Sequence, residues 1–279
     1  MLFRLLPSGR QLSFRTPRLF FPHAPAIFLP SLAGRVNTTM HKTTQVSTTD
    51  DLDWATALPT LPIRPSRGLT ENDQHFSVRN IHCVGRNYAA HAREMGGDPD
   101  REPPFFFGKP TFGSVWYCGN EVPTRVIPYP PSTSQLEYEV ELVIAVGVGF
   151  AVGVDLTRRD VQQKAKAAGR PWWTGKGGFP GAAPMGPVVP VATLDIDAEL
   201  WLTVNGVERQ RTKPMHDMVW SVPELLEQAN QVLGDVQTGD LIMTGTPAGV
   251  GRLEVGDVVV AGMDGLCELS FTIGPPASR

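Results

Sequence analysis

The sequence predicts an α+β fold in which β-strands dominate. Glycine and proline are abundant, with 28 and 26 among 279 residues, and they divide the chain with frequent turns. The apolar runs between these turns are mostly short and of strand length, whereas helix-like periodic stretches are few. A hydrophobic content of 41% is enough to bury a full core. We therefore expect one folded domain that follows an N-terminal extension.

The first 50 residues differ in composition from the rest. They are rich in arginine, serine and threonine and contain no acidic residue before Asp50. This bias is typical of a mitochondrial transit peptide, although several prolines would interrupt an amphipathic helix and Met40 offers an alternative start. We predict an extension over residues 1–50, an extended lead-in over 51–77 and a catalytic domain over 78–275. The expected location is the cytoplasm, or the mitochondrial matrix if the extension is a transit peptide.

The first half of the expected domain contains strands and two helices. "VRNIHCVGRNY" (78–88) predicts a strand that ends in a Gly-Arg-Asn turn, and "AAHAREM" (89–95) a short helix. "VELVIAVGVGF" (140–150) is a mostly apolar run, which indicates a strand buried on both faces. "LTRRDVQQKAKAAG" (156–169) predicts a helix with Thr157 or Asp155 as its N-cap and a stop at its final glycine.

The second half begins with a hairpin and ends with strands. In "LWLTVNGVERQ" (200–210), alternating residues surround Asn-Gly, the strongest short hairpin signal. "VPELLEQANQVLG" (222–234) predicts a helix that stops at Gly234. "DLIMTGTPAGVG" (240–251) and "GDVVVAGMDGLCELSFTI" (256–273) predict strands joined by glycine-rich turns. No apolar run reaches the roughly 18 residues of a membrane span.

Charge and cysteine content narrow the range of functions. A net charge of −3 and the lack of Lys/Arg blocks in the body argue against nucleic-acid binding. The 3 cysteines are far apart and form no C-x-x-C pair, which indicates neither a zinc cluster nor a disulfide framework. We expect a small-molecule ligand.

Three glutamates alternate in "QLEYEVELVI" at positions 137, 139 and 141. In a strand they share one face at spacings of about 6.5 to 7 Å, which is compatible with a solvated face. The apolar run after Glu141, however, places that residue at the border of the core, where an unpaired carboxylate is costly. Two converging carboxylates and a third acid suit a hard cation such as Mg²⁺. Asp155 is the candidate third acid, with a helix N-cap as its alternative role.

Two further groups are candidates for catalysis. His91 and Glu94 are three residues apart in a predicted helix, so the carboxylate could orient the imidazole as a general base. An exposed His/Glu pair on the surface is the alternative. Lys176 lies in "WWTGKGG", where a lysine among aromatics and glycines is either an anion contact or a surface residue.

Seven stretches follow one another between about Val78 and Phe271: "CVGRNYAAHAREMG", "LEYEVELVIAVG", "VDLTRRDVQ", "PWWTGKGG", "APMGPVVP", "LTVNGVERQ" and "DLIMTGTPAGVG". In this order they resemble the fumarylacetoacetate hydrolase family, and within it the fumarylpyruvate and acylpyruvate hydrolases most closely. The resemblance implies a mixed β-sandwich roll, a homodimer, a bound Mg²⁺ or Mn²⁺, and cleavage of a carbon-carbon bond in a β-diketo acid.

The resemblance also implies roles for individual residues. The metal ligands would be Glu139, Glu141 and Asp155. His91 and Glu94 would form a dyad that activates water for attack on the distal carbonyl of an acylpyruvate. Lys176 and Gln162 would offset negative charge that develops on the pyruvate carbon, while Gly245 and Thr246 would contact substrate. Arg86 and Arg93 are candidates for contact with a distal carboxylate such as that of fumarylpyruvate. The products would be pyruvate and a carboxylic acid such as fumarate.

Two other hypotheses remain open at this point. The same site would support decarboxylation of oxaloacetate or isomerisation of a dienoic diacid, and only the His91–Glu94 dyad favours hydrolysis. A different class is an inactive module of the same fold. The connection between Glu141 and Asp155, residues 142–154, looks short for the family, and we expect it to hold Asp155 away from the glutamates if a segment is missing.

Overall fold

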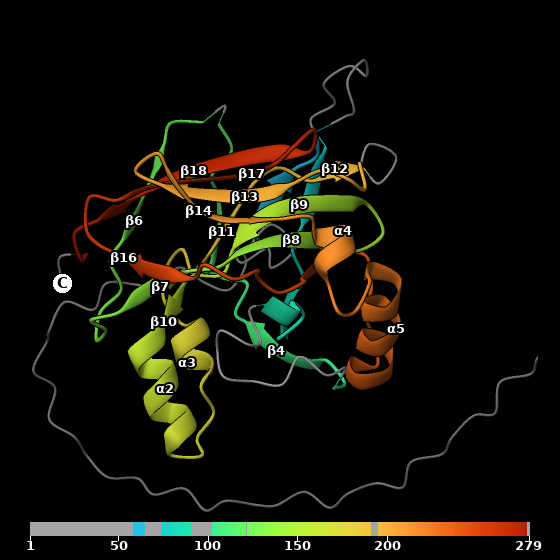
Figure 1. Cartoon of the computed structure of the whole chain (residues 1–279), viewed down its shortest axis with the longest axis horizontal. Coiled ribbons are helices and arrows are strands. Elements are labelled where there is room, and N and C mark those ends of the chain that lie inside the picture. The colour runs from blue at the N-terminus through green and yellow to red at the C-terminus, as the bar shows by residue number, and fades with distance from the viewer. Residues whose placement is uncertain (1–57, 65–73, 91–101, 121, 191–194, 278–279) are drawn as a thin grey trace, which may run out of the picture. The chain divides into compact units, whose positions relative to one another are not determined.

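The computed structural model describes residues 58–64, 74–90, 102–120, 122–190 and 195–277 (Figure 1). All of them fall in the compact unit Asp50–Arg279, and they are described here by themselves. The dyad residues His91 and Glu94, and also Arg93, lie outside the described residues.

Strands dominate the described part of the chain and form one eight-stranded and one five-stranded sheet, with two smaller sheets beside them. The eight-stranded sheet has the spatial order β4 (Phe105–Lys109), β3 (Asn80–Gly85), β15 (Asp240–Met243), β8 (Val140–Ala145), β9 (Gly149–Val154), β11 (Ala183–Met185) and β5 (Val115–Tyr117), and β12 (Val189–Pro190) also pairs with β9. The five-stranded sheet has the order β14 (Val207–Thr212), β13 (Leu200–Val204), β17 (Val258–Met263), β18 (Cys267–Gly274) and β6 (Arg125–Pro128). The α+β fold with mostly β structure is confirmed.

The smaller sheets have three strands and two strands. The three-stranded sheet contains β10 (Thr157–Arg158), β7 (Leu136–Tyr138) and β16 (Gly251–Leu253), in that order. The two-stranded sheet pairs β1 (Thr60–Pro62) with β2 (His75–Ser77).

The main core lies where β8 and β9 contact β13, β17 and β18 of the five-stranded sheet (Figure 1). Leu142 and Val152 from one sheet and Leu202 from the other belong to this cluster. Val143 and Ala151 point the opposite way into a second apolar cluster. Strands β8 and β9 are therefore buried on both faces, as their continuous apolar sequence predicts.

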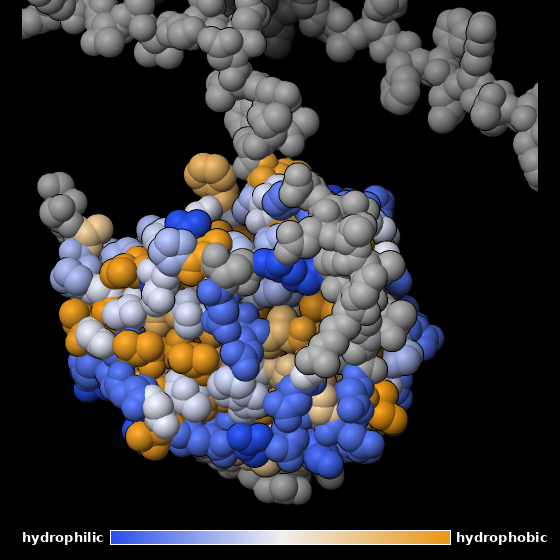
Figure 2. All heavy atoms as spheres, turned by 90° about the horizontal axis from the view of Figure 1, so that it is seen from above, coloured by the Kyte–Doolittle hydropathy of each residue, from blue (hydrophilic) through white to orange (hydrophobic). Residues whose placement is uncertain are grey.

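The outer face of the five-stranded sheet retains exposed apolar side chains. Val258 and Val126 both pair with Thr272, so they share a face, and they are 41% and 57% exposed. Figure 2 views the molecule from above Figure 1, on the side of this sheet, and shows apolar side chains interspersed with polar ones.

The run "VELVIAVGVGF" forms a hairpin, so the prediction of one strand there is wrong. Strand β8 ends at Ala145 and β9 begins at Gly149. Gly147 lies between them at φ +80°, where a side chain would be strained, and an added Cβ would lie 2.3 Å from the Thr238 hydroxyl. A glycine within an apolar run therefore turns the chain without any polar turn residue.

The other hairpin and the long helix near the C-terminus are confirmed. Asn205 and Gly206 have φ values of 52° and 75° and join β13 to β14. Helix α5 (Val222–Leu233) begins with a capping box between Ser221 and Glu224 and ends at Gly234, at φ 78°. Both features are set by local sequence signals.

Helix α2 (Arg159–Ala167) begins later than predicted. Thr157 and Arg158 form β10, and the N-cap residue Arg158 has no side-chain capping bond. The N-cap predicted at Thr157 or Asp155 is therefore wrong. Helix α2 lies beside the short helix α3 (Trp173–Lys176) (Figure 1). A further short helix, α4 (Pro214–Asp217), precedes α5. Within the described segments, we find no helix of the length and apolar character that a bilayer crossing demands.

Candidate metal centre and catalytic cavity

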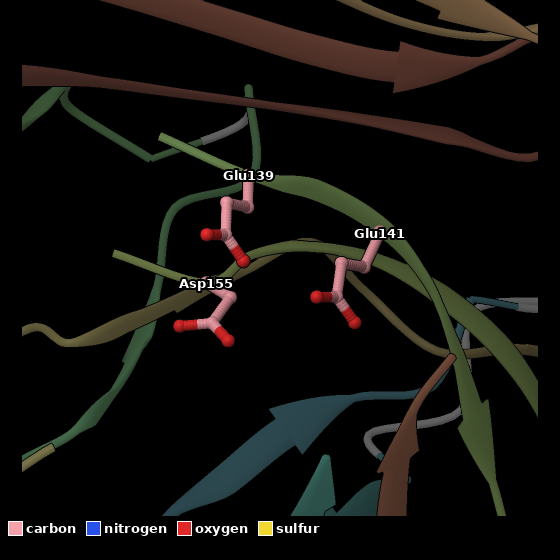
Figure 3. A group of neighbouring side chains, drawn as sticks. All are labelled: Glu139, Glu141 and Asp155. Carbon is pink, nitrogen blue, oxygen red and sulfur yellow. The ribbon is translucent and has the colours of Figure 1, made fainter. Parts of the chain in front are cut away.

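Three buried carboxylates converge where the chain passes from the three-stranded sheet to the eight-stranded sheet and back. Glu139 links the end of β7 to the start of β8, Glu141 is the second residue of β8, and Asp155 directly follows β9. Figure 3 shows the three side chains directed toward one another. One carboxylate oxygen of each lies within 4.8 Å of the others, and all three residues are buried.

The short connection creates this arrangement. Residues 142–154 lie within the hairpin of β8 and β9, whose first and last residues, Val140 and Val154, pair with each other. The Asp155 backbone N–H therefore donates to the Glu139 carbonyl at 2.8 Å. The expectation that this connection would hold Asp155 away from the glutamates is wrong, because an antiparallel hairpin returns the chain to its starting point.

Three cations surround the carboxylates. Lys176 Nζ lies 2.6 Å from Glu139 Oε2 and 2.9 Å from Asp155 Oδ2. Lys109 Nζ lies 2.7 Å from Asp155 Oδ1 and also donates to the Leu156 and Ala182 carbonyls at 3.1 and 3.0 Å. These bonds fix the orientation of Asp155.

Arg159 holds the other side of the site. Its guanidinium donates to Glu137 and Glu139, and its third bond reaches Gln162 Oε1 at 2.7 Å. Glu137 is therefore the partner of Arg159, outside the convergent group, and Arg159 fixes both Glu139 and the Gln162 amide.

The charges of the site do not balance in the described residues. Four carboxylates, at positions 137, 139, 141 and 155, face three cations, at positions 109, 159 and 176. Glu141 is the least compensated, since its one hydrogen bond within the described segments comes from the Gly245 N–H at 2.8 Å. Burial, together with the nearby Asp155 and Glu139, raises the pKa of Glu141 well above its ordinary value.

The pKa of Lys176 is raised as well, but for a base this favours the charged form. Burial would lower its pKa, but the carboxylates of Asp155 and Glu139 outweigh that effect and raise the pKa of Lys176. Its ammonium group is therefore a fixed positive charge at neutral pH.

This donor set fits a divalent metal ion. All three convergent donors are carboxylate oxygens, which hard cations such as Mg²⁺ and Mn²⁺ prefer. A divalent ion would also compensate Glu141, which costs free energy when it is buried as an anion without a cationic partner. Metal binding at Glu139, Glu141 and Asp155 remains a prediction that the geometry favours.

The carboxylates lie at the base of a cavity of about 420 Å³. The predicted site residues Arg86, Gln162, Lys176, Gly245 and Thr246 all line it. The structure therefore brings together, around the convergent acids, every described residue for which the sequence predicts a role.

Aromatic side chains form one wall of this cavity. Phe105, Phe107 and Trp172 line it, and the rings of Phe107 and Trp172 are 5.0 Å apart between centroids. The wall contacts the charged base, because Lys176 Nζ lies 5.5 Å from the centre of the Phe107 ring. A planar organic molecule would find apolar contact there.

The turn at Gly245 and Thr246 is locked to the acidic strand. Gln210 from β14 accepts a hydrogen bond from Val140 N at 2.9 Å and donates to Thr246 Oγ1 at 2.9 Å and to the Pro247 carbonyl at 3.0 Å. Its amide thus joins Val140, which lies between the two convergent glutamates in the sequence, to the predicted substrate contact.

Sequence reasoning missed Lys109, Arg159 and Gln210 as parts of the site. Lys109 is the last residue of the aromatic strand "FFFGK", and a lysine at the end of such an apolar strand could have been recognised as a candidate buried cation. Arg159 opens a helix next to a predicted acid. Gln210 carried no local signal, because its partners are 70 and 36 residues away.

Comparisons with known proteins agree with this geometry. Residues 80–274 match the family described as "Fumarylacetoacetate (FAA) hydrolase C-terminal". The crystal structure of fumarylpyruvate hydrolase from Pseudomonas aeruginosa in complex with Mn²⁺ and pyruvate is 41% identical, with a TM-score of 0.70 over 78% of this chain and 97% of that one.

Curated relatives carry different names. The mitochondrial oxaloacetate tautomerase FAHD1 of Arabidopsis thaliana is 39% identical over 69% of this chain and 90% of its own length. The mitochondrial oxaloacetate decarboxylase of Dictyostelium discoideum is 36% identical over 70% of this chain and 94% of its own. The family match, the fold and the convergent acids lead to one conclusion: this chain belongs to the fumarylacetoacetate hydrolase family.

Proposed function

We propose that the protein is a metal-dependent hydrolase that cleaves the carbon-carbon bond of an acylpyruvate, such as fumarylpyruvate. The observation that carries this proposal is the group of buried carboxylates, undercompensated in charge, at the base of a cavity with an aromatic wall. The 41% identity to a fumarylpyruvate hydrolase crystallised with Mn²⁺ and pyruvate supports both the metal and the substrate class.

Glu139, Glu141 and Asp155 would hold the metal, Mg²⁺ or Mn²⁺. When bound, such an ion acts as a Lewis acid that polarises the diketo oxygens and stabilises negative charge there. Lys109 and Arg159 keep the carboxylates in place through the bonds described above. Because these bonds hold the carboxylates in place beforehand, the site would need little rearrangement during the reaction.

The remaining steps belong to side chains of the cavity. His91, oriented by Glu94, would take a proton from water, and the hydroxide would add to the distal carbonyl; this assignment rests on the sequence. The carbon-carbon bond then breaks, and its electron pair stays on the pyruvate fragment as an enolate. Protonation of that carbon releases pyruvate and the carboxylic acid.

Lys176 and Gln162 would assist the pyruvate fragment. Both line the cavity, and the ammonium of Lys176 carries a fixed positive charge beside the acids. A fixed cation near the forming enolate lowers the barrier, because it stabilises charge that develops in the transition state.

Conversion of oxaloacetate is the second candidate function. The names of the Arabidopsis and Dictyostelium relatives favour it, as tautomerase and as decarboxylase respectively. Both reactions use the pyruvate-like end of the substrate, so the acids and Lys176 would serve them as well. Isomerisation of a dienoic diacid belongs to the same group, and a 5-carboxymethyl-2-hydroxymuconate delta-isomerase from Mycobacterium smegmatis is 31% identical.

A comparison of two substrates separates the candidates. With Mg²⁺, we expect the protein to release equal amounts of fumarate and pyruvate from fumarylpyruvate, with a higher kcat/KM than for loss of oxaloacetate. A His91→Ala variant should lose the hydrolysis by about 10² to 10⁴-fold. Faster turnover of oxaloacetate, kept in full by His91→Ala, would replace the hydrolase proposal with the second candidate.

The homodimer and the cell compartment remain predictions. Sedimentation equilibrium tests the first, and a mass near twice that of one chain is expected. For the second, the acid-free, arginine-rich composition before Asp50 and the mitochondrial names of relatives support a mitochondrial location. Import of the full chain into isolated mitochondria, with cleavage before residue 51, is the expected result.

A further inference from the structure

One face of helix α2 lines the cavity from its buried base toward solvent. Arg159, Gln162 and Lys166 are three and four residues apart, which places them along one helix face, and all three line the cavity. Arg159 is buried against the acids, and Gln162 is bound to Arg159. Lys166 lies at the exposed end of this row and makes no ion pair with the described residues.

A second exposed cation also lines the cavity. Arg86 is exposed and lines the cavity, and the nearest acid with which it pairs in the described segments, Glu102, is 3.9 Å away. The turn that presents Arg86 is fixed, because Asn87 donates to the Thr244 carbonyl at 2.9 Å and accepts from Trp220 N at 2.8 Å. Arg86 itself has φ 62°, an unusual value for a residue with a side chain.

The charge of the cavity lining therefore changes with depth. Its buried part contains the undercompensated acids, which favour a divalent ion, and its exposed part contains two cations: Lys166, which has no ion pair within the described residues, and Arg86, whose contact with the exposed Glu102 is long at 3.9 Å. The aromatic wall of Phe105, Phe107 and Trp172 belongs to the same cavity. A ligand that fits this distribution chelates metal at one end, is planar and apolar in the middle, and carries negative charge at the other end.

We propose that Lys166, together with Arg86, binds a carboxylate at the far end of the acyl group, so that the preferred substrates are acylpyruvates that end in a second carboxylate. This inference rests on the proposed acylpyruvate site. A substrate bound by its diketo end reaches the exposed end only if its acyl chain is long enough. The four-carbon oxaloacetate has no such extension.

The test compares fumarylpyruvate with acetylpyruvate, which has the same diketo acid end and no distal carboxylate. The quantity measured is the ratio of their kcat/KM values. We expect Lys166→Gln to lower this ratio about tenfold, the effect of one charge-assisted hydrogen bond to the distal carboxylate. Lys166→Arg should restore most of it. Because Lys166 is exposed, the wild-type ratio should also fall as salt is raised from 50 to 500 mM.

Lys164→Gln is the matched control. Lys164 lies on the same helix and carries the same charge, but does not line the cavity. In Lys164→Gln, the ratio of kcat/KM for fumarylpyruvate to that for acetylpyruvate should stay within twofold of the wild-type ratio. The inhibition constant of pyruvate, which has no acyl tail, should likewise be similar in both variants, since pyruvate would occupy the base of the cavity alone.

The outcomes separate this inference from the proposed function. An unchanged ratio in Lys166→Gln overturns the distal-carboxylate subsite, and so does an equal loss in Lys164→Gln, which would indicate a general effect of charge. If the wild type cleaves neither compound, the hydrolase proposal fails. The subsite is then still tested by calorimetry with Mg²⁺, where the ratio of the two Kd values must fall in Lys166→Gln for the inference to stand.

Discussion

Substitution of Glu141 by glutamine should separate metal binding from the stability of the metal-free protein. Glu141 is buried beside Glu139 and Asp155 and forms no salt bridge within the described residues, so that only the more distant charge of Lys176 offsets its own. Glutamine keeps the shape and the oxygen that accepts from Gly245 N, but removes the charge. The metal-free variant should therefore melt at or above the wild-type temperature, because a buried charge that repels its neighbours is gone.

The effect of metal should fall sharply in the same variant. At a metal concentration of 100 times Kd, binding stabilises the native state by about 2.7 kcal/mol. For the roughly 200-residue family domain, residues 80–274, this corresponds to a rise in Tm of about 5 to 10 °C. Changes in residues that merely support metal ligands cost about 10 to 100-fold in affinity, so loss of a charged ligand should cost at least about 100-fold. The stabilisation left at the same concentration is then about 0.4 kcal/mol, or about 1 °C.

Thermal unfolding with chelator and with Mg²⁺ or Mn²⁺ measures both effects. Glu137→Gln is the control, since Glu137 is a neighbouring acid that pairs with Arg159 and lies outside the convergent group. The control should retain the metal-induced rise in Tm. A Glu141→Gln protein that gains as much from metal as the wild type would refute the assignment of Glu141 as a ligand.

Two further predictions concern buried polar groups, one beside the site and one at the start of β15. Gln210→Leu leaves the Val140 N–H and the Pro247 carbonyl without their buried partner, at about 1 to 3 kcal/mol each, so urea unfolding should show a loss near 3 kcal/mol and kcat/KM should fall; a loss below 1 kcal/mol would contradict this reading. Burial alone would raise the pKa of Asp240, but hydrogen bonds led by Arg79 outweigh it and lower that pKa. A lowered folded pKa gives stability that is present above the unfolded value of about 3.9 and is lost as the pH falls through the folded value. Wild type and Asp240→Asn should therefore differ in stability at pH 7 by about 2 kcal/mol. The difference should begin to shrink below about pH 4 and vanish only below the lowered folded pKa, and a difference independent of pH would exclude this linkage.

Elements with local signals could be predicted from the sequence. The Asn205–Gly206 hairpin and the helix between Ser221 and Gly234 each depend on residues within a few positions of one another. The turn at Gly147 could not, because it is flanked by apolar residues on both sides and looks like the interior of one strand. Its position is fixed by the pairing of β8 with β9, which periodicity does not reveal.

The acidic residues of the candidate site could be predicted from the sequence, whereas two of its three cations, Lys109 and Arg159, were not. Alternation put Glu137, Glu139 and Glu141 on one face, and the apolar run put Glu141 at the border of the core. The resemblance to the family then selected Glu139 and Glu141, and the structure brings these two together with Asp155. Asp155 was equally compatible with a helix N-cap, but helix α2 begins only at Arg159, and Asp155 instead contacts Lys109 and Lys176. Those partners are far away in the sequence, so no local pattern could have paired them.

The most direct test of the metal-dependent hydrolase is the loss of the enol absorbance of fumarylpyruvate, followed with Mg²⁺, then with excess chelator, and then after Mg²⁺ or Mn²⁺ is restored. We predict that turnover stops with chelator and returns with metal, and that it is absent from Glu139→Ala, which removes one of the convergent acids. Turnover that persists in chelator, or in Glu139→Ala, would contradict the central claim that these carboxylates hold a metal ion needed for the reaction.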